Sequence, residues 1–189
     1  MTMNMTMKSP LTGAFVLTAF LGSAAMAGEN PMVGGAAMYD TKTIVENAVN
    51  SADHTTLVAA VQAAGLVETL SGPGPFTVFA PTNAAFAALP EGTVETLLQP
   101  ENKEMLTKVL TCHVVGADVM SDALVKMIAD DGGAHPIPTL GGCTLTGKMQ
   151  DGKVVIEDEN GTMATVTIAD VKQSNGVIHV IDAVLTPKM

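Results

Sequence analysis

The first half of the chain places apolar residues three and four positions apart, which is the spacing of an amphipathic helix. Three such segments follow residues that can begin a helix, namely Asp40 or Thr41, Asp53 and Pro100. Their apolar faces are Ile44, Val45, Ala48 and Val49, then Leu57, Val58, Val61 and Ala64, and then Met105, Leu106, Val109 and Leu110. Gly65 is suited to end the second helix, because glycine readily takes a left-handed conformation. A weaker fourth pattern runs from Ser121 to about Gly132.

The second half changes to the period of two that is typical of strands. Four short segments are rich in Val, Ile and Thr: Cys143 to Met149, Lys153 to Glu157, Met163 to Ile168, and Val177 to Val184. Asp151-Gly152 and Asn160-Gly161 separate the first three and favour two-residue hairpin turns, because both positions tolerate positive φ. The pattern predicts an antiparallel meander. Helices followed by strands indicate an α+β domain, not alternating βαβ units.

The N-terminus has the three parts of a secretory signal peptide. Lys8 supplies positive charge, the segment from Leu11 to Ala25 is apolar or small, and Ala25-Met26-Ala27 is a cleavage site. The apolar stretch is shorter than the roughly 20 residues that a membrane-spanning helix needs. We therefore expect residues 1–27 to be removed, with an uncleaved anchor as the alternative. The mature chain is expected to have a flexible lead-in at residues 28–37, one domain at residues 38–188 and no membrane insertion.

The composition excludes one class of partner. The chain has a net charge of −10, with 19 acidic residues, nine lysines and no arginine. Tyr39 is its one tyrosine, and it has no tryptophan. Nucleic-acid binding needs positive charge for the phosphates and aromatic rings for the bases, so we expect no nucleic-acid partner.

Cys112 and Cys143 are the only cysteines. An exported chain with two cysteines most often pairs them, so we predict one disulfide. The alternative is a catalytic thiol at Cys112 that His113 activates. If residues 112–115 form a strand, these two side chains point to opposite faces, which argues against that pair.

Two apolar segments far apart in the chain carry a family resemblance. They are Phe76 to Phe86, FTVFAPTNAAF, and Gly176 to Pro187, GVIHVIDAVLTP, with Cys112-His113-Val114-Val115 between them. Together they resemble the two signature segments and the central His motif of the fasciclin (FAS1) domain family, over residues 38–188. The resemblance implies an α+β fold, a wedge-shaped β-sandwich with helices packed along one side and antiparallel C-terminal strands.

The two signature segments also have the pattern of core strands. Phe76 to Ala80 is partly apolar on both faces, as in a strand covered on both sides, and Pro81 ends it. Thr82 or Asn83 can begin the next helix. In the second segment Val177, His179 and Ile181 share one face, and Ile178, Val180 and Asp182 share the other. We therefore interpret both segments mainly as scaffold.

The resemblance implies that His113 is a binding residue, with Val114 and Val115 beside it. In animal matrix proteins of this family the motif usually reads Tyr-His and is associated with integrin binding. Cys112 stands at the tyrosine position here, and the chain has no arginine for an RGD sequence. We therefore carry over His113, Val114 and Val115 alone. The alternative is that His113 is a hydrogen-bonded structural residue.

The sequence predicts neither a metal site nor a catalytic site. The four histidines, His54, His113, His135 and His179, lack the spacing of a metal motif. The acidic run from Glu157 to Gly161 lacks the ligand order of an EF-hand, and we interpret it as a solvated hairpin tip. Motifs of serine hydrolases, P-loops and dinucleotide sites are missing from the sequence. We therefore expect no cofactor, no metal and no enzymatic activity.

The expected function is that of a secreted, non-catalytic binding or adhesion module of bacterial origin. It would engage a protein or polysaccharide at the cell surface or envelope, in the periplasm or outside the cell. The alternative is a periplasmic envelope protein that binds a small apolar ligand or polysaccharide in a cleft between the helices and the sandwich. The contact surface is expected in loops such as Gly116 to Asp122 or Asp130 to Gly142, because binding residues concentrate on connections.

Overall fold

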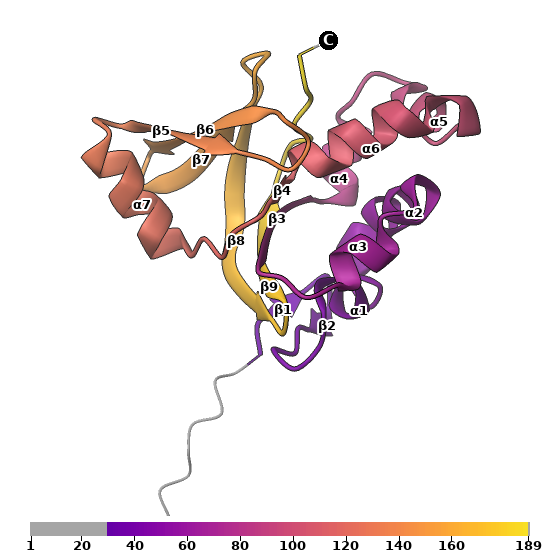
Figure 1. Ribbon diagram of the computed structural model, residues 1–189, viewed down its shortest axis with the longest axis horizontal. Coiled ribbons are helices and arrows are strands. Elements are labelled where there is room, and N and C mark those ends of the chain that lie inside the picture. Colours follow the sequence, from indigo (N-terminus) through magenta and orange to yellow (C-terminus); the bar gives the residue numbers. More distant parts are fainter. Residues whose placement is uncertain (1–29, 189) are drawn as a thin grey trace, which may run out of the picture.

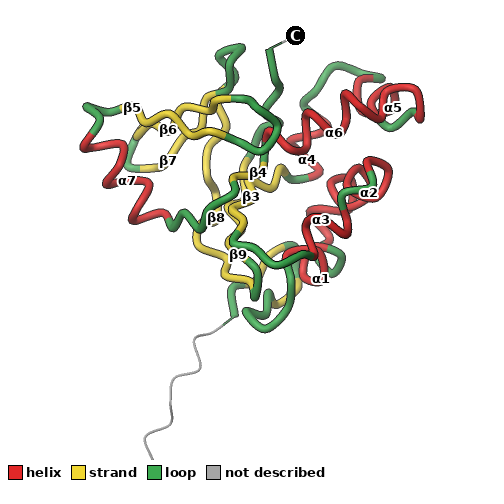
Figure 2. Tube along the Cα trace, viewed as in Figure 1, coloured by secondary structure: helices red, strands yellow, loops and turns green. Residues whose placement is uncertain are grey.

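The computed structural model describes residues 30–188, so the predicted signal peptide at residues 1–27 lies outside the described residues. The helices are α1 (Ile44–Ala48), α2 (Thr55–Ala64), α3 (Val67–Ser71), α4 (Asn83–Ala87), α5 (Thr93–Leu97), α6 (Lys103–Cys112) and α7 (Ser121–Asp130), with 3-10 turns η1 (Ala52–His54) and η2 (Pro100–Asn102). The strands are β1 (Met32–Val33), β2 (Ala36–Ala37), β3 (Phe76–Pro81), β4 (Val114–Val115), β5 (Ala134–Pro138), β6 (Thr144–Gln150), β7 (Lys153–Glu157), β8 (Met163–Gln173) and β9 (Gly176–Ile181) (Figure 2).

One curved sheet organises the molecule (Figure 1). Its strand order is β4-β3-β9-β8-β7-β6-β5, and neighbouring strands are antiparallel except for β3 and β9. These two strands contain the two signature segments and pair in parallel, with Phe79 opposite His179. Helices α1 to α6 lie along one side of β3 and β9, whereas α7 contacts β5 and β6 on the other side. The expected α+β wedge with helices along one side is therefore confirmed.

Short local motifs determine where α1 begins and where α2 ends. Thr43 begins α1, in place of the expected Asp40 or Thr41. Its hydroxyl accepts the amide of Glu46, and the Glu46 carboxylate accepts the amide of Thr43, which is a capping box. α2 ends at Gly65 as predicted, with a left-handed φ of 75°.

Two apolar residues expected inside the core lie at the surface instead. Val49 and Met105 are 52% and 42% exposed. Val49 follows the last residue of α1, so its side chain lies beyond the regular face of the helix. Met105 lies in the first turn of α6, one turn before buried Val109, at the exposed start of the helix.

The predicted meander is present, with one turn that differs from the prediction. Asp151-Gly152 forms the expected two-residue turn between β6 and β7, and both residues have positive φ. The prediction of a two-residue turn at Asn160-Gly161 is wrong. Because Glu157 pairs with Met163, all of residues 158–162 connect β7 to β8.

The sheet separates two apolar cores. Val78, Ala80, Ile178 and Val180 project into the core that the helices α1, α2 and α6 cover. Phe79 and Ile181 project into a second core, which lies inside the curved part of the sheet against α7. The alternation predicted for β9 is confirmed, and both signature segments are scaffold over most of their length.

Within residues 30–188, both end strands of the sheet have features that prevent pairing with a further strand. β5 contains Pro136 and Pro138, which have no backbone N–H to offer to another strand. β4 is covered by the turn before β6, because the amide of Leu140 donates to the carbonyl of Val114 at 2.8 Å. The curved sheet thus returns on itself at this seam.

Cys112 and Cys143 lie at the same seam. Their sulfur atoms are at bonding distance, their Cα atoms are 5.5 Å apart, and both side chains are buried. The argument against a Cys112-His113 pair assumed a strand that begins at residue 112. Cys112 is instead the last residue of α6, and β4 begins two residues later. The pair closes the seam covalently between the end of α6 and the start of β6.

Replacing both cysteines with serine is expected to lower the free energy of unfolding by about 3 kcal/mol, because the crosslink restricts the unfolded chain. The two positions are 31 residues apart in the sequence. Urea denaturation of the mature protein and of the double variant would measure the loss. Thiol titration of the native protein serves as the control, and two reactive thiols would contradict the prediction.

The N-terminal segment is folded where a flexible lead-in was the expectation for residues 28–37. β1 and β2 form a hairpin, and the buried side chains of Val33 and Met38 join the core beneath the helices. Gly34 lies against η1, where a Cβ atom would be 2.3 Å from the Ser51 hydroxyl oxygen. The flexible lead-in is therefore wrong for residues 32–37.

Candidate functional site

The three residues to which the resemblance points lie in the interior. His113, Val114 and Val115 are 2%, 3% and 6% exposed. His113 follows the last residue of α6, and Val114 and Val115 form β4 and belong to the two cores. These exposures favour the structural alternative for His113.

His113 forms hydrogen bonds through both ring nitrogens. Nδ1 donates to the carbonyl of Val109 at 2.9 Å, and Nε2 accepts the amide of Leu185 at 2.9 Å. Because an amide only donates, this pattern requires a neutral ring with its proton on Nδ1. Burial lowers the pKa of His113 to about 4, against the smaller opposing effects of Val109 and Asp158. His113 is thus a neutral link between α6 and the C-terminal segment.

An apolar fissure lies between the helices and the sheet, and His113 and Val114 are part of its floor. Its walls come from α1, α2 and α3, and it holds about 40 Å³. A second apolar space of about 30 Å³ lies on the other side of Ile44. Ligand pockets usually hold several hundred Å³, roughly 300 or more. Neither space is large enough for a metabolite or a sugar.

The loop between β4 and α7, residues 116–120, is fixed to the sheet through its backbone. The buried Thr77 hydroxyl of β3 donates to the carbonyl of Ala117 at 2.6 Å and accepts the amide of Val119 at 2.8 Å. Nε2 of His179 on β9 donates to the carbonyl of Val119 at 2.8 Å. Side chains of two adjacent strands thus hold three backbone polar groups of this loop.

Asp170 extends this attachment into the first residue of α7. Its carboxylate accepts the amide of Ser121 at 2.7 Å and also binds the Ser121 hydroxyl. Asp170 lies at an irregularity of β8 and has a φ of 58°, which costs energy in a residue other than glycine. Its own amide donates to Nδ1 of His179 at 3.3 Å. Asp170 and His179 therefore form one unit behind the loop.

The side chains between these attachment points face an open cleft. Asp118 and Met120 line it together with Lys172 and two segments, residues 73–75 and 173–177. The cleft holds about 560 Å³ and is open to solvent along one side. Because the backbone of the loop is fixed on both sides of each residue, Asp118 and Met120 have defined positions.

Buried amides make the opposite wall of the cleft rigid. Nδ2 of Asn175, in the turn between β8 and β9, donates to the carbonyls of Leu70 and Gly72. Its Oδ1 accepts the amide of Ile44 at 3.0 Å, which joins this turn to the start of α1. The side chains of Asn47 and Gln173 hydrogen-bond to each other beside it. A satisfied buried network of this kind fixes one conformation.

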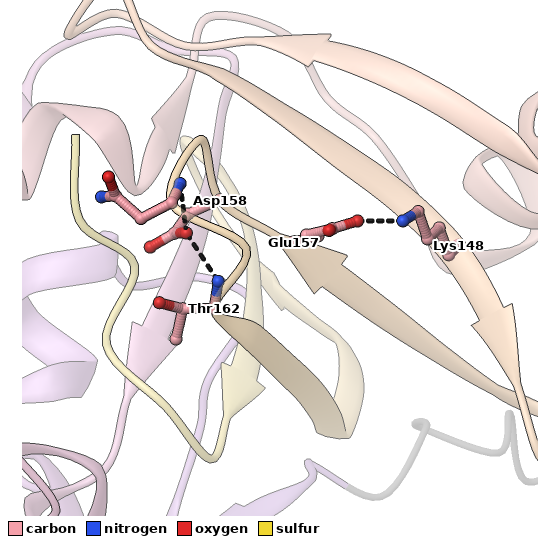
Figure 3. Close-up of polar contacts among 5 residues, drawn as sticks. Lys148, Glu157, Asp158 and Thr162 are labelled. Atoms are coloured by element: carbon pink, nitrogen blue, oxygen red, sulfur yellow. Dashed lines mark hydrogen bonds and ion pairs between the residues drawn. The ribbon is translucent and has the colours of Figure 1, made fainter. Parts of the chain in front are cut away.

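The acidic run at residues 157–161 is a structural clamp, not the solvated hairpin tip expected from the sequence. Asp158 is buried and accepts the amides of Asn160 and Thr162 at 2.9 and 2.8 Å (Figure 3). Its second oxygen accepts the amide of Thr186 at 2.8 Å. The neighbouring Glu157 forms an ion pair with Lys148 (Figure 3).

The remaining candidate groups do not converge. Among residues 30–188, no three His, Cys, Asp or Glu side chains are arranged to hold a metal ion. His54 bonds to Ser51, and His135 pairs with Asp131 at the surface. The expected contact loop at Asp130 to Gly142 contains β5, and its last turn closes the sheet, so only Gly116 to Asp122 lies at an open cleft.

A comparison of the chain with known protein families agrees with this fold. The family model described as "Fasciclin domain" matches residues 52–187. The chain belongs to the fasciclin domain family. In this fasciclin domain the match begins at η1, so the hairpin and α1 precede the matched region although they are part of its core.

Several proteins are similar to this fasciclin domain. A Synechocystis protein named sll1483 is 52% identical over 161 residues, which cover 85% of this chain and 82% of that protein. Transforming growth factor-beta-induced protein ig-h3 of Sus scrofa is 37% identical over 131 residues, 69% of this chain and 17% of that protein. The solved FAS1 domain pair of the insect cell adhesion molecule Fasciclin I has a TM-score of 0.67 at 20% identity. The match covers 76% of this chain and 50% of the pair, and it supports the fold alone.

Proposed function

We propose that this fasciclin domain is an exported, non-catalytic binding module that engages a protein or polysaccharide at the cell envelope or outside the cell. The observation that carries the proposal is the rigid loop beside the open cleft. Residues that bind partners are commonly held on loops that a scaffold keeps in place, and here Thr77, His179 and Asp170 keep the loop in place. Membership of the fasciclin domain family supports the same class of function.

The openness and mixed lining of the cleft, and the small volume of the fissure, favour a macromolecule over a small apolar ligand. The cleft of about 560 Å³ is open and mixes polar and apolar side chains, as protein surfaces that bind other macromolecules do. The apolar fissure of about 40 Å³ is too small for the alternative, a small apolar ligand between the helices and the sheet. One observation still favours that alternative, because His113 and Val114 lie at the floor of the fissure.

The proposed location follows from the N-terminal sequence. Residues 1–27 have the pattern of a signal peptide, and no helix in residues 30–188 is long and apolar enough to span a bilayer. Fractionation of periplasm, cell surface and medium would locate the mature chain. Confinement to the periplasm would exclude adhesion between cells and leave envelope partners.

Changing Met120 and Lys172 to glutamate together is expected to weaken binding of the labelled mature protein to intact cells or isolated envelope by about tenfold or more, because both side chains line the cleft. The matched control is Met149→Glu with Lys153→Glu, which adds the same charge to exposed residues of β6 and β7. Titration by fluorescence would measure both. Equal binding by the two double variants would exclude the cleft as the contact surface.

A further inference from the structure

His179 connects the sheet to the half of the loop that carries Met120. Its two ring nitrogens have opposite roles, since Nε2 donates to the carbonyl of Val119 and Nδ1 accepts the amide of Asp170. The ring is 1% exposed and stacks on Phe79 at 5.7 Å between centroids. This pattern exists only while the ring is neutral with its proton on Nε2.

We propose that His179 makes the fasciclin domain's contact loop sensitive to pH, because protonation of its ring releases the segment from Met120 to Ser121. The role of the loop in binding rests on the proposed function, whereas its release on protonation does not. A proton can be added only at Nδ1, where it would face the amide of Asp170, and two donors would then oppose each other.

Asp170 transmits the change to the loop. When its amide loses Nδ1 as acceptor, its backbone at positive φ loses a buried partner that helps to hold the irregular conformation. The carboxylate of the same residue holds the amide and hydroxyl of Ser121. Displacing Asp170 therefore loosens the start of α7 and the Met120 side chain before it.

Thr77 limits the release to one half of the loop. Its hydroxyl holds the carbonyl of Ala117 and the amide of Val119, and a threonine hydroxyl does not titrate in this range. Val119 therefore keeps its amide bond to β3 after His179 is protonated. The structure assigns pH sensitivity to the Ser121 end and stability to the Val119 end.

The charges around His179 set the pH range. Burial lowers its pKa below 6.5, whereas the carboxylates of Asp170 on β8 and Asp118 on the loop act in the opposite direction. From β3, the neighbours are Phe79 and Thr77, which do not titrate. The release is therefore expected below pH 6.5, and removing one of the two carboxylates should move it to lower pH.

Hydrogen exchange by NMR on the mature protein between pH 7.5 and pH 4.5 tests the release without any partner. After correction for intrinsic exchange, the protection of the Ser121 and Asp170 amides is expected to fall about tenfold or more with the titration of the His179 ring. Protection of Val119 and of Ile156 in the core should not change. Constant protection of Ser121 while His179 titrates would overturn the proposal, as would loss of protection at all four amides together.

Two variants keep the test decisive. His179→Gln can donate and accept but does not titrate, so Ser121 should lose its pH dependence. If that variant does not fold, the exposed change Asp118→Asn should shift the His179 titration and the Ser121 release to lower pH by equal amounts, and unequal shifts would contradict the coupling. Cell binding at pH 7.5 tests the cleft separately, so either idea can fail alone.

Discussion

Replacing Asp158 with alanine is expected to lower the free energy of unfolding by about 4 kcal/mol, because three backbone amides lose a buried carboxylate as their acceptor at once. These amides belong to Asn160, Thr162 and Thr186. The first two shape the connection between β7 and β8, and the third holds the C-terminal segment to that connection. Urea denaturation at pH 7.5, followed by circular dichroism, would measure the loss.

A neighbouring carboxylate provides the control. Glu159 also accepts two backbone amides, those of Thr144 and Lys188, but it is fully exposed. Water can replace an exposed acceptor, so Glu159→Ala is expected to cost only a small fraction of the stability that Asp158→Ala costs. Equal losses for the two variants would mean that burial of Asp158 is not what makes it important. Asp158→Asn, which keeps one oxygen, should fall between them.

The sequence predicted the parts of the fold that local patterns decide. Apolar spacing located α1, α2, α6 and α7, and the Asp151-Gly152 turn located the β6–β7 hairpin. The parallel pairing of β3 with β9 joins residues a hundred positions apart, and no local pattern specifies such a pairing. β5 carries two prolines, which are unfavourable inside a sheet and are tolerated here only because β5 is an end strand.

The candidate site lies in one of the two loops that the sequence suggested, but the way the loop is held could not be predicted. The loop at Gly116 to Asp122 was expected from its polar, glycine-containing sequence. Its attachments come from Thr77, Asp170 and His179, on three strands that are distant in sequence from the loop, so only the folded chain brings them together. Val114 and Val115, by contrast, have the sequence of a buried strand, and that pattern predicts their burial better than the family resemblance does.

Acid is expected to destabilise the domain partly through His113. The pKa of this ring is lowered from 6.5 to about 4 by burial, so the unfolded chain binds a proton that the folded chain excludes. The stability that the neutral ring provides is complete above pH 6.5 and is lost progressively as the pH falls toward 4. A shift of this size corresponds to roughly 3 kcal/mol.

His113→Phe separates this contribution from the rest of the acid response. Phenylalanine fills a similar volume but leaves the buried amide of Leu185 and the carbonyl of Val109 without their partner, at a cost of about 4 kcal/mol at pH 7.5. Near pH 4 the wild type has lost most of its advantage, so the difference is expected to shrink to about 1 kcal/mol. Urea denaturation of both proteins at several pH values gives the two curves.

His135→Phe is the matched control for exchanging a histidine for phenylalanine, because His135 is only partly buried and lies beside Asp131. A constant difference between wild type and His113→Phe at all pH values would contradict the linkage.

The His113→Phe variant also decides between a binding role and a structural role for His113. As its ring is 2% exposed and bonded on both sides, a folded His113→Phe protein should bind cells at pH 7.5 as the wild type does. Lost binding with intact folding would return His113 to the contact surface.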